Sequence, residues 1–327
     1  MSDTENHVNL LEMFNQGQFQ CTSCNETLQM SEVPPLSICI CTNCEGENLA
    51  PAQIAGFWLY KELAVGGMGA VYFALHADYP EDTFAMKILP RDHRDNETLI
   101  KNIKDEIGVM KALGGNEAMV AAVAAGHEDN EYFLVTRYIK GNTLDDLIVK
   151  HGKIHEDIII QVALRILSAE SYIFKQGYLY RDLKPENILI EEGGIAYLCD
   201  FGICMPISQA HQDLGDLIQG SPFYIPPERL MGEGEHAYSE IYSLGLVMYH
   251  ALSGKLFYNA TDIEEIAKMH VNSTSDEDMI SHMQGLAPDL SNVIINMIQR
   301  NPADRYQTFL EVERDLFKIF TARSYIL

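Results

Sequence analysis

Apolar residues between positions 57 and 89 fall into three short runs that have the length and composition of strands. Gly66-Gly67-Met68-Gly69 separates the first run from the second, and the polar segment 77–82 separates the second from the third. Clusters of glycine, proline and aspartate of this kind mark turns. Further along, the apolar positions within residues 103–110 recur at the spacing of one helix face. The pattern predicts three consecutive strands joined by two turns, followed by a helix.

No apolar stretch of the chain is long enough to span a membrane as a helix. The best candidate, residues 118–125, has eight residues, whereas a membrane-spanning helix needs about 18. No basic region followed by an apolar stretch begins the chain, so we expect no signal peptide. We therefore expect a soluble, cytoplasmic protein.

The composition indicates a strongly acidic globular protein. Its 327 residues are 47% hydrophobic and 21% charged, which excludes global disorder and collagen-like structure and fits one large or two modest domains. The 47 Asp and Glu residues outnumber the 23 Lys and Arg residues, for a formal net charge of −24. Such a surface repels phosphate backbones and anionic headgroups, so we expect neither nucleic acid nor a membrane as a partner.

Four cysteines near the start of the chain have the spacing of a zinc site. Cys21 and Cys24 form one Cys-x2-Cys pair, and after sixteen residues Cys41 and Cys44 form another. Two cysteines three positions apart on a tight turn can bind one metal together, and a second such turn completes a tetrahedral set. The pattern resembles a zinc ribbon, so residues 1–50 are predicted to form an N-terminal tail and a module with a structural Zn²⁺.

Other interpretations of these cysteines remain open. Disulfides would suit a secreted protein, which nothing in the sequence indicates, and a redox Cys-x-x-Cys pair is the other alternative. Cys39 is interpreted as a packing residue or else as a substitute ligand. Residues 1–50 contain no Lys or Arg, since the first basic residue is Lys61. We therefore expect the ribbon to dock a protein or to stabilise the neighbouring lobe rather than to bind nucleic acid, and residues 45–54 to form a linker.

The strands that flank the glycine cluster indicate what the cluster does. It lies between the first strand and Val71-Tyr72, and the third strand contains Phe84-Ala85-Met86-Lys87. Glycines in such a turn let the backbone approach phosphate groups, and a lysine on a neighbouring strand can pair with those phosphates. The arrangement is typical of a site for the phosphates of a nucleotide.

With these features the sequence resembles a protein kinase over nearly all of residues 55–327. Lys87 matches the family's phosphate-pairing lysine, and Glu106 in the predicted helix matches its ion-pair partner. The segment Tyr180-Arg181-Asp182-Leu183-Lys184-Pro185-Glu186-Asn187 resembles the catalytic loop. Asp200-Phe201-Gly202 follows thirteen residues after the end of that loop and resembles the metal-binding triplet.

Two further matches complete the series. Pro226-Pro227-Glu228 stands where the family has Ala-Pro-Glu, and Arg305 stands where a distal arginine pairs with that glutamate. The amino-acid sequence of the glycine loop is similar to that of bacterial Hanks-type serine/threonine kinases. The resemblance implies an α+β, two-lobed kinase fold preceded by the zinc ribbon, with a β-rich N-lobe over residues 55–138 and an α-rich C-lobe over residues 139–327.

The resemblance implies a role for each matched residue in transferring phosphate from ATP to Ser or Thr hydroxyls of proteins. Asp182 would accept the proton of the substrate hydroxyl, and Lys184 would stabilise the transferring phosphate. Asn187 and Asp200 would hold Mg²⁺, and Lys87 would position the ATP phosphates. The other ATP-binding positions implied by the resemblance are Leu63, Gly66, Gly67, Gly69, Val71, Ala85, Glu106 and Leu189.

Four residues depart from the family's pattern. Ala64 replaces the first loop glycine, Tyr180 the loop histidine, Arg137 an acidic residue after the gatekeeper position, and Glu240 an aspartate that anchors the catalytic loop. An aromatic ring with a hydroxyl can supply the packing and the backbone hydrogen bond of the histidine, whereas the longer Glu240 side chain displaces its carboxylate. An active kinase is favoured because none of the residues matched to catalysis is lost. The alternative is a nucleotide-binding pseudokinase scaffold with the ribbon as its docking module.

The sequence also bears on regulation and substrates. Arg181 precedes the catalytic aspartate, which is a feature of kinases switched by phosphate on the activation loop. Residues 203–219 offer only Ser208 as an obvious acceptor, and Ser221 is expected to orient the substrate site. We therefore expect full activity without a loop phosphate. Glu186 and the acidic surface predict basic protein substrates.

Overall fold

The computed structural model of the chain describes residues 3–66, 69–90, 93–128, 130–210, 220–272 and 276–324. These residues fold into two units. The first comprises Met1–Lys111 and Ala121–Tyr138, and the second comprises Ala112–Val120 and Ile139–Leu327. A six-stranded sheet dominates the first unit, and helices dominate the second. The chain therefore has the mixed helix and sheet content that we expected.

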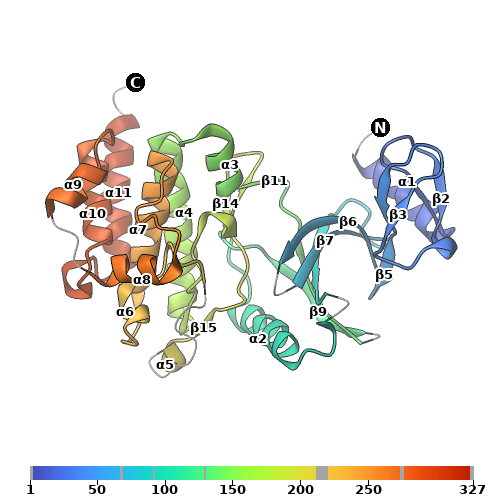
Figure 1. Cartoon of the computed structure of the whole chain (residues 1–327), viewed down its shortest axis with the longest axis horizontal. Coiled ribbons are helices and arrows are strands. Elements are labelled where there is room, and N and C mark those ends of the chain that lie inside the picture. Colours follow the sequence, from blue (N-terminus) through green and yellow to red (C-terminus); the bar gives the residue numbers. More distant parts are fainter. Residues whose placement is uncertain are drawn as a thin grey trace. The chain divides into compact units, whose positions relative to one another are not determined.

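An antiparallel sheet is the framework of the first unit (Figure 1). Its strands lie side by side in the order β5 (Ala52–Ile54), β6 (Phe57–Gly66), β7 (Gly69–His76), β8 (Phe84–Ile88), β10 (Glu131–Arg137) and β9 (Ala122–Glu128). The three strands predicted between positions 57 and 89 are β6, β7 and β8, so that prediction is confirmed. The helix predicted around residues 103–110 is α2 (Glu97–Leu113), which is also confirmed.

Strand β6 shows how alternation along a strand gives two packed faces. Phe57 and Leu59 lie in the core on one face of the sheet, together with apolar side chains of β5, β7, β8 and β10. Trp58 and Tyr60 belong to a second cluster, in which the ring of Phe14 lies 5.5 Å from each of theirs. Full burial of an apolar side chain of this size contributes about 1.5–3 kcal/mol. The N-terminal segment is therefore packed onto the sheet.

That N-terminal segment consists of one helix and two short hairpins. Its elements are α1 (Asp3–Asn15), β1 (Gln18–Gln20) paired with β2 (Thr27–Gln29), the 3-10 turn η1 (Met30–Glu32), and β3 (Ile38–Ile40) paired with β4 (Glu47–Leu49). The two antiparallel hairpins carry the four cysteines on their turns and strand ends. This is the arrangement that the paired Cys-x2-Cys spacing predicts.

The expected linker over residues 45–54 is wrong. Strands β4 and β5 occupy most of this segment, and Ala50, Ala52 and Ile54 are buried. Pro51 lies between the two strands, where its missing N–H breaks no ladder of hydrogen bonds. The chain therefore passes from the hairpins into the sheet through packed strands.

The second unit is mostly helical (Figure 1). Its helices of seven or more residues are α3 (Leu144–His151), α4 (Glu156–Lys175), α7 (Ala237–Ser253), α8 (Ile263–Val271), α9 (Asp276–His282), α10 (Pro288–Met297) and α11 (Phe309–Ser324). The short elements are β11 (Gly141–Thr143), β12 (Tyr178–Leu179), η3 (Pro185–Asn187), β13 (Ile188–Glu191), β14 (Ala196–Leu198), β15 (Met205–Pro206), α5 (Ile207–Ala210), α6 (Pro227–Leu230) and η4 (Pro302–Asp304). Among the described residues, no helix is both long and apolar enough to cross a lipid bilayer.

Helix α7 is the most buried helix of this unit. Nearly all of its residues are buried, including Tyr242 and Glu240. A Cβ at Gly245 would lie 2.6 Å from the side chain of Ile298 and 2.8 Å from that of Met297. Only glycine therefore lets the end of α10 approach α7 so closely.

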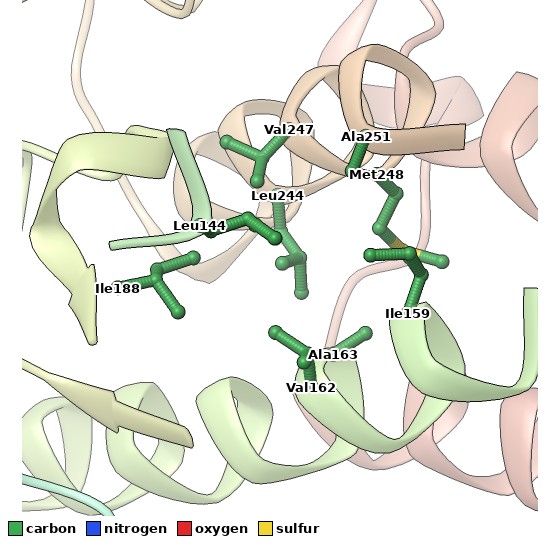
Figure 2. Close-up of a pocket in the computed structure, with 9 residues that line it drawn as sticks. All are labelled: Leu144, Ile159, Val162, Ala163, Ile188, Leu244, Val247, Met248 and Ala251. Carbon is green, nitrogen blue, oxygen red and sulfur yellow. The ribbon is translucent and has the colours of Figure 1, made fainter. Parts of the chain in front are cut away.

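A small apolar cavity remains between α3, α4, α7 and β13. Figure 2 shows the side chains that line it, which are Leu144, Ile159, Val162, Ala163, Ile188, Leu244, Val247, Met248 and Ala251. Its volume is about 10 Å³, which is near the lower limit for a single water molecule. The lining offers almost no polar partner, so the cavity is a packing gap and not a ligand site.

Candidate functional site

A buried ion pair joins the sheet to α2 in the first unit. Lys87 lies on β8, which pairs with β7 on one side and β10 on the other. Its Nζ lies 2.8 Å from Oε2 of Glu106 on α2, and the two side chains are only 14% and 4% exposed. The structure thus brings these two predicted residues together and fixes the position of the ammonium group.

Two residues of the glycine cluster lie at the ends of the paired strands β6 and β7. Gly66 and Gly69 are paired at the ends of these strands, while Gly67 and Met68 lie outside the described residues. A Cβ at Gly69 would come within 2.8 Å of the carbonyl oxygen of Ile88, so this position requires glycine. Ala64 is accommodated on β6, paired with Val71 on β7.

Four of the ATP-binding positions that the resemblance implies lie on strands. Leu63, Val71 and Ala85 are on β6, β7 and β8 of the first unit, and all three are half-buried. Leu189 is on β13 of the second unit, paired with Thr143 and Tyr197. Regular strand structure therefore fixes the backbone at each of these four positions.

In the second unit, two donors hold one oxygen of the Asp182 carboxylate. Lys184 Nζ and Asn187 Nδ2 each lie 2.8 Å from Oδ2, and Asn187 Nδ2 also lies 2.9 Å from the Asp182 carbonyl oxygen. The other oxygen, Oδ1, is buried and has no hydrogen-bond partner among the described residues. The carboxylate is thus oriented by one oxygen and offers the second as an acceptor.

Asp200 lies on a backbone turn close to this loop. Its φ of 58° is unusual for a residue other than glycine, and its Oδ1 accepts a hydrogen bond of 3.2 Å from the Gly202 N–H. The carbonyl of Asn187 accepts a 3.0 Å bond from the N–H of Cys199, the residue before Asp200. Oxygen donors of Asp200 and Asn187 are of the kind that Mg²⁺ prefers, so these residues fit that ion.

Tyr180 makes both contacts that we expected of it. Its ring packs against Phe201, with centroids 5.5 Å apart and planes at 77°. Its hydroxyl donates a 2.5 Å hydrogen bond to the carbonyl of Cys199. The ring is almost fully buried, and this burial raises the pKa of the phenol well above its ordinary value, so the hydroxyl stays protonated as a donor.

Glu240 contacts the backbone of the expected catalytic loop despite its extra methylene group. Both oxygens of its carboxylate accept from the N–H of Arg181, at 3.0 and 3.3 Å. The side chain is 2% exposed. Burial raises the pKa of Glu240 to about 7 against the opposing effect of the Arg229 charge. The departure from aspartate therefore preserves a contact with the backbone beside Asp182.

Glu228 and Arg305 form the other expected pair. Arg305 Nη1 and Nη2 lie 2.8 and 2.9 Å from the two oxygens of Glu228, and the side chains are 0% and 1% exposed. Two parallel bonds between a guanidinium and a carboxylate give a directional contact. This pair ties α6 to the segment that follows α10.

The expected phosphate acceptor Ser208 lies on α5, and residues 211–219 lie outside the described residues.

The four ribbon cysteines form a compact cluster in the first unit. Their sulfur atoms all lie within 4.8 Å of one another, with 3.5 Å between Cys21 and Cys44 and 3.7 Å between Cys24 and Cys41. All seven cysteines are free, and these distances far exceed the roughly 2.0 Å of a disulfide bond. A tetrahedral zinc ion holds sulfur at about 2.3 Å, which separates neighbouring sulfurs by about 3.8 Å. The cluster therefore fits Zn²⁺.

The two cysteine turns share one backbone geometry. The N–H of Asn25 donates to the carbonyl of Cys21, and the N–H of Glu45 donates to the carbonyl of Cys41, both at 2.9 Å. Asn25 and Glu45 both have a φ near 60°. The backbone N–H of Ser23 is the main reason that the pKa of Cys21 is lowered to about 6, and the thiolate is the form that binds metal.

Asn48 supports the cysteine cluster, and we did not predict it. Its side chain is buried and accepts a 2.8 Å hydrogen bond from the N–H of Thr22. Its Nδ2 donates to the carbonyl of Gly46 at 2.9 Å and to the sulfur of Cys21 at 3.5 Å.

Cys39 does not belong to the cysteine cluster. It lies in the apolar cluster with Phe14, where burial raises the pKa of its thiol.

Comparison with known proteins identifies a family that matches most of the chain. Residues 57–317 match the model of the protein kinase domain. A probable serine/threonine-protein kinase of Clostridium perfringens is 29% identical over 254 residues, which cover 78% of this chain and 37% of that protein. Serine/threonine-protein kinase PrkC of Bacillus subtilis is 27% identical over 271 residues, which cover 83% and 41%. Serine/threonine-protein kinase PknK of Mycobacterium tuberculosis is 31% identical over 270 residues, which cover 81% and 24%. The chain therefore matches less than half the length of each of these relatives.

Proposed function

Because this chain belongs to the protein kinase domain family, we propose that it transfers the γ-phosphoryl group of ATP to serine or threonine hydroxyls of proteins. The observation that carries the proposal is the Asp182 carboxylate. Lys184 and Asn187 hold its Oδ2, while Oδ1 is buried and has no hydrogen-bond partner within the described part of the chain. A substrate hydroxyl would donate to that oxygen and lose its proton there as the phosphoryl group arrives.

The remaining residues position the reactants in this proposal. Mg²⁺, held by Asp200 and Asn187, would neutralise charge on the phosphates. Lys87, held by Glu106, would pair with the phosphates, and the backbone of the glycine turn would lie along them. Lys184 would stabilise the transferring group from its place beside Asp182. The resemblance also implies adenine contacts at Leu63, Val71 and Ala85 of the first unit and at Leu189 of the second.

Phosphate transfer to peptides tests this function. Peptides with a single Ser, Thr or Tyr acceptor are incubated with labelled ATP, with and without magnesium. We expect magnesium-dependent labelling of the Ser and Thr peptides, which the Lys87→Met variant loses. Lys140→Met is a matched control, because Lys140 and its partner Glu192 are 64% and 65% exposed. Tight nucleotide binding without transfer by the wild-type protein would instead establish the scaffold function.

Basic proteins are the substrates that we propose. Glu186 is exposed beside the catalytic loop, and Asp145 lies close enough to raise the pKa of the Glu186 carboxyl, after the larger effect of partial burial. Two carboxylates at this place attract Lys or Arg near the accepting hydroxyl. Glu186→Gln is therefore expected to raise the KM for a basic peptide and to leave the KM for a neutral peptide unchanged.

Zn²⁺ bound by Cys21, Cys24, Cys41 and Cys44 is the second part of the proposal. The sulfur distances support it, and a structural zinc site contributes about 10–16 kcal/mol of apparent binding energy. Within the first unit, Phe14 and Phe19 then attach the zinc module, residues 1–50, to Trp58 and Tyr60 of the sheet. We therefore propose that the module stabilises the N-lobe, residues 55–138, ahead of a C-lobe at residues 139–327.

Metal analysis together with tryptophan fluorescence tests the zinc site. The chain has a single tryptophan, Trp58, which lies in the cluster between the module and the sheet. We expect one zinc ion per chain and a red shift of the Trp58 emission when a chelator removes the metal. Cys24→Ser is expected to lose the zinc, and Cys39→Ala is expected to keep it. Full retention of the emission spectrum without zinc would contradict the structural role.

The module also presents an apolar strand to solvent. Ile38 and Ile40 on β3 are 61% and 56% exposed, and Ile40 is paired with the exposed Glu47. Because residues 1–50 contain no Lys or Arg, we propose that this strand docks an apolar segment of a basic protein substrate. An Ile38→Ser/Ile40→Ser double variant is expected to raise the KM for a basic protein but not for a short peptide.

A further inference from the structure

Three charged side chains meet beneath the catalytic loop in the second unit. Arg181 precedes Asp182, Arg229 lies on α6, and Glu235 lies between α6 and α7. Arg181 Nε and Nη2 each lie 3.0 Å from Glu235 Oε1. Arg229 Nε and Nη2 lie 2.7 and 2.6 Å from Glu235 Oε2. The three side chains are only 2–4% exposed, so one carboxylate bridges two buried guanidinium groups.

This bridge acts on the backbone beside the catalytic aspartate. Arg229 Nη1 donates a 2.8 Å hydrogen bond to the carbonyl of Arg181, while the N–H of Arg181 donates to Glu240. Arg181 itself has a φ of 70°, a conformation that costs about 1–3 kcal/mol in a residue other than glycine and that persists only where the surroundings impose it. Side chains of Arg229 and Glu240 therefore hold both polar groups of this residue.

The bridge also reaches the segment that follows the metal-binding triplet. Arg181 Nη1 lies 2.9 Å from the sulfur of Met205 on β15, and β15 pairs with β12, which leads into the catalytic loop. The same guanidinium is bound to Glu235 through Nε and Nη2. The Glu235 carboxylate thus fixes the orientation of the Arg181 guanidinium that contacts Met205.

Two buried guanidinium groups need a nearby anion to offset their charge. In kinases whose loop is ordered by phosphorylation, a phosphate group provides that anion through new contacts with arginine. Here Glu235 already provides a carboxylate with one oxygen for each arginine. A second anion at the same place would compete with Glu235 for the same donors and would be repelled by its charge.

We propose that Glu235 is a positioning residue that substitutes for a phosphate on the activation loop, so that the catalytic loop is held in place without phosphorylation. This inference rests on the proposed kinase function. In this proposal, residues that do not contact the substrate determine the orientation of Asp182.

Steady-state kinetics on a single-acceptor peptide tests the inference. Glu235→Gln keeps the size of the side chain and removes its charge, and is expected to lower kcat on the order of 10- to 100-fold while leaving the KM for ATP unchanged. Glu235→Asp keeps the charge and is expected to recover part of kcat. Glu192→Gln, on an exposed acid, is the matched control. Wild-type kcat in Glu235→Gln would overturn the inference.

Phosphatase treatment of the wild-type protein provides a second arm that needs no variant. We expect the treated protein, with removal of phosphate verified by intact mass, to keep its kcat. A loss of kcat that is restored by autophosphorylation would overturn the inference. Should Glu235→Gln fail to fold, Arg229→Gln takes its place, since it removes the bond to the Arg181 carbonyl and leaves the Arg181–Glu235 pair.

Amide hydrogen exchange separates this inference from the proposed function. In Glu235→Gln we expect residues 179–187 to exchange about tenfold faster than in the wild type, and in Glu192→Gln at the wild-type rate. An inactive wild-type protein would contradict the kinase function, yet faster exchange would still show that Glu235 positions the loop. Unchanged exchange together with unchanged kcat in an active protein would refute the role of Glu235 alone.

Discussion

Replacing Glu170 by leucine is expected to stabilise the protein, and most strongly at alkaline pH. Glu170 lies on α4 and is 1% exposed, and neither of its carboxyl oxygens has a hydrogen-bond partner among the described residues. Burial raises the pKa of this carboxyl well above its ordinary value of 4.5, and the charge of Glu240 raises it further. The folded protein therefore keeps Glu170 protonated at a pH at which the unfolded chain ionises it.

The direction of the pH dependence follows from this difference. Above pH 4.5 the folded state binds more protons at Glu170 than the unfolded state does, so stability falls as the pH rises. The contribution of the neutral carboxyl is complete below the ordinary pKa and is lost as the pH rises through the raised pKa. A side chain that cannot ionise removes this loss.

The size of the effect follows from the missing hydrogen bonds. A buried polar group without a partner costs about 1–3 kcal/mol, and each kcal/mol shifts the melting temperature of a large domain by about 2–4 °C. Glu170→Leu is therefore expected to raise Tm by roughly 2–12 °C at pH 8, with a smaller gain at pH 5.

Thermal unfolding from pH 5 to pH 8 checks this prediction. Glu170→Gln cannot ionise, so its Tm is expected to gain on the wild type as the pH rises. Glu192→Gln, in which the replaced acid is 65% exposed, is expected to show no such trend. A lower Tm for Glu170→Leu at pH 8, or a gain that is equal at both pH values, would refute the reasoning.

Three further substitutions test the packing and the loop contacts. Arg305→Met leaves the buried Glu228 carboxylate unpaired and should lower the free energy of unfolding by about 3–5 kcal/mol in urea titrations; a loss below about 1 kcal/mol would contradict the pair's importance. Phe14→Ala removes a ring that packs on Trp58 and Tyr60, and should cost about 3–5 kcal/mol and shift Trp58 emission to the red. His270→Leu removes the 3.0 Å bond from Nε2 to the Pro222 carbonyl, next to Ser221. It should raise the KM for a peptide several-fold and leave the KM for ATP unchanged, and a change in both would refute a specific role in substrate orientation.

The strands, the helix α2 and the cysteine turns could be predicted from the sequence because local patterns specify them. Three apolar runs separated by turn residues became β6, β7 and β8, since each run pairs with its neighbour in the chain. The cysteine turns followed from spacing alone, because two ligands three positions apart must lie on one tight turn.

The predicted linker failed for a physical reason. Strands β4 and β5 have three residues each and are separated only by Ala50 and Pro51. Runs this short contain too few positions to show an alternating pattern, and proline is an ordinary sign of a loop. Only the sheet partners, β3 and β6, show that these residues are strands.

Asn48 and Glu235 could not be predicted because their partners lie far away in the chain. Asn48 contacts a cysteine 27 positions earlier, and Glu235 contacts Arg181 54 positions earlier. No periodic pattern connects such residues, and a single polar side chain has the appearance of a solvated one until the fold buries it. The residues of the proposed catalytic loop could be predicted only through the resemblance to a family, because that resemblance joins motifs far apart in the chain.

The proposed kinase function depends most directly on Asp182. The decisive measurement is kcat for phosphate transfer to a Ser peptide by the wild type and by Asp182→Asn, with Glu192→Gln as the control. Because asparagine keeps the shape of the carboxylate but cannot accept the proton, we expect kcat to fall by about 10²- to 10⁴-fold while ATP binding is unchanged. Transfer by Asp182→Asn at the wild-type rate would contradict the assignment of Asp182 as the catalytic base.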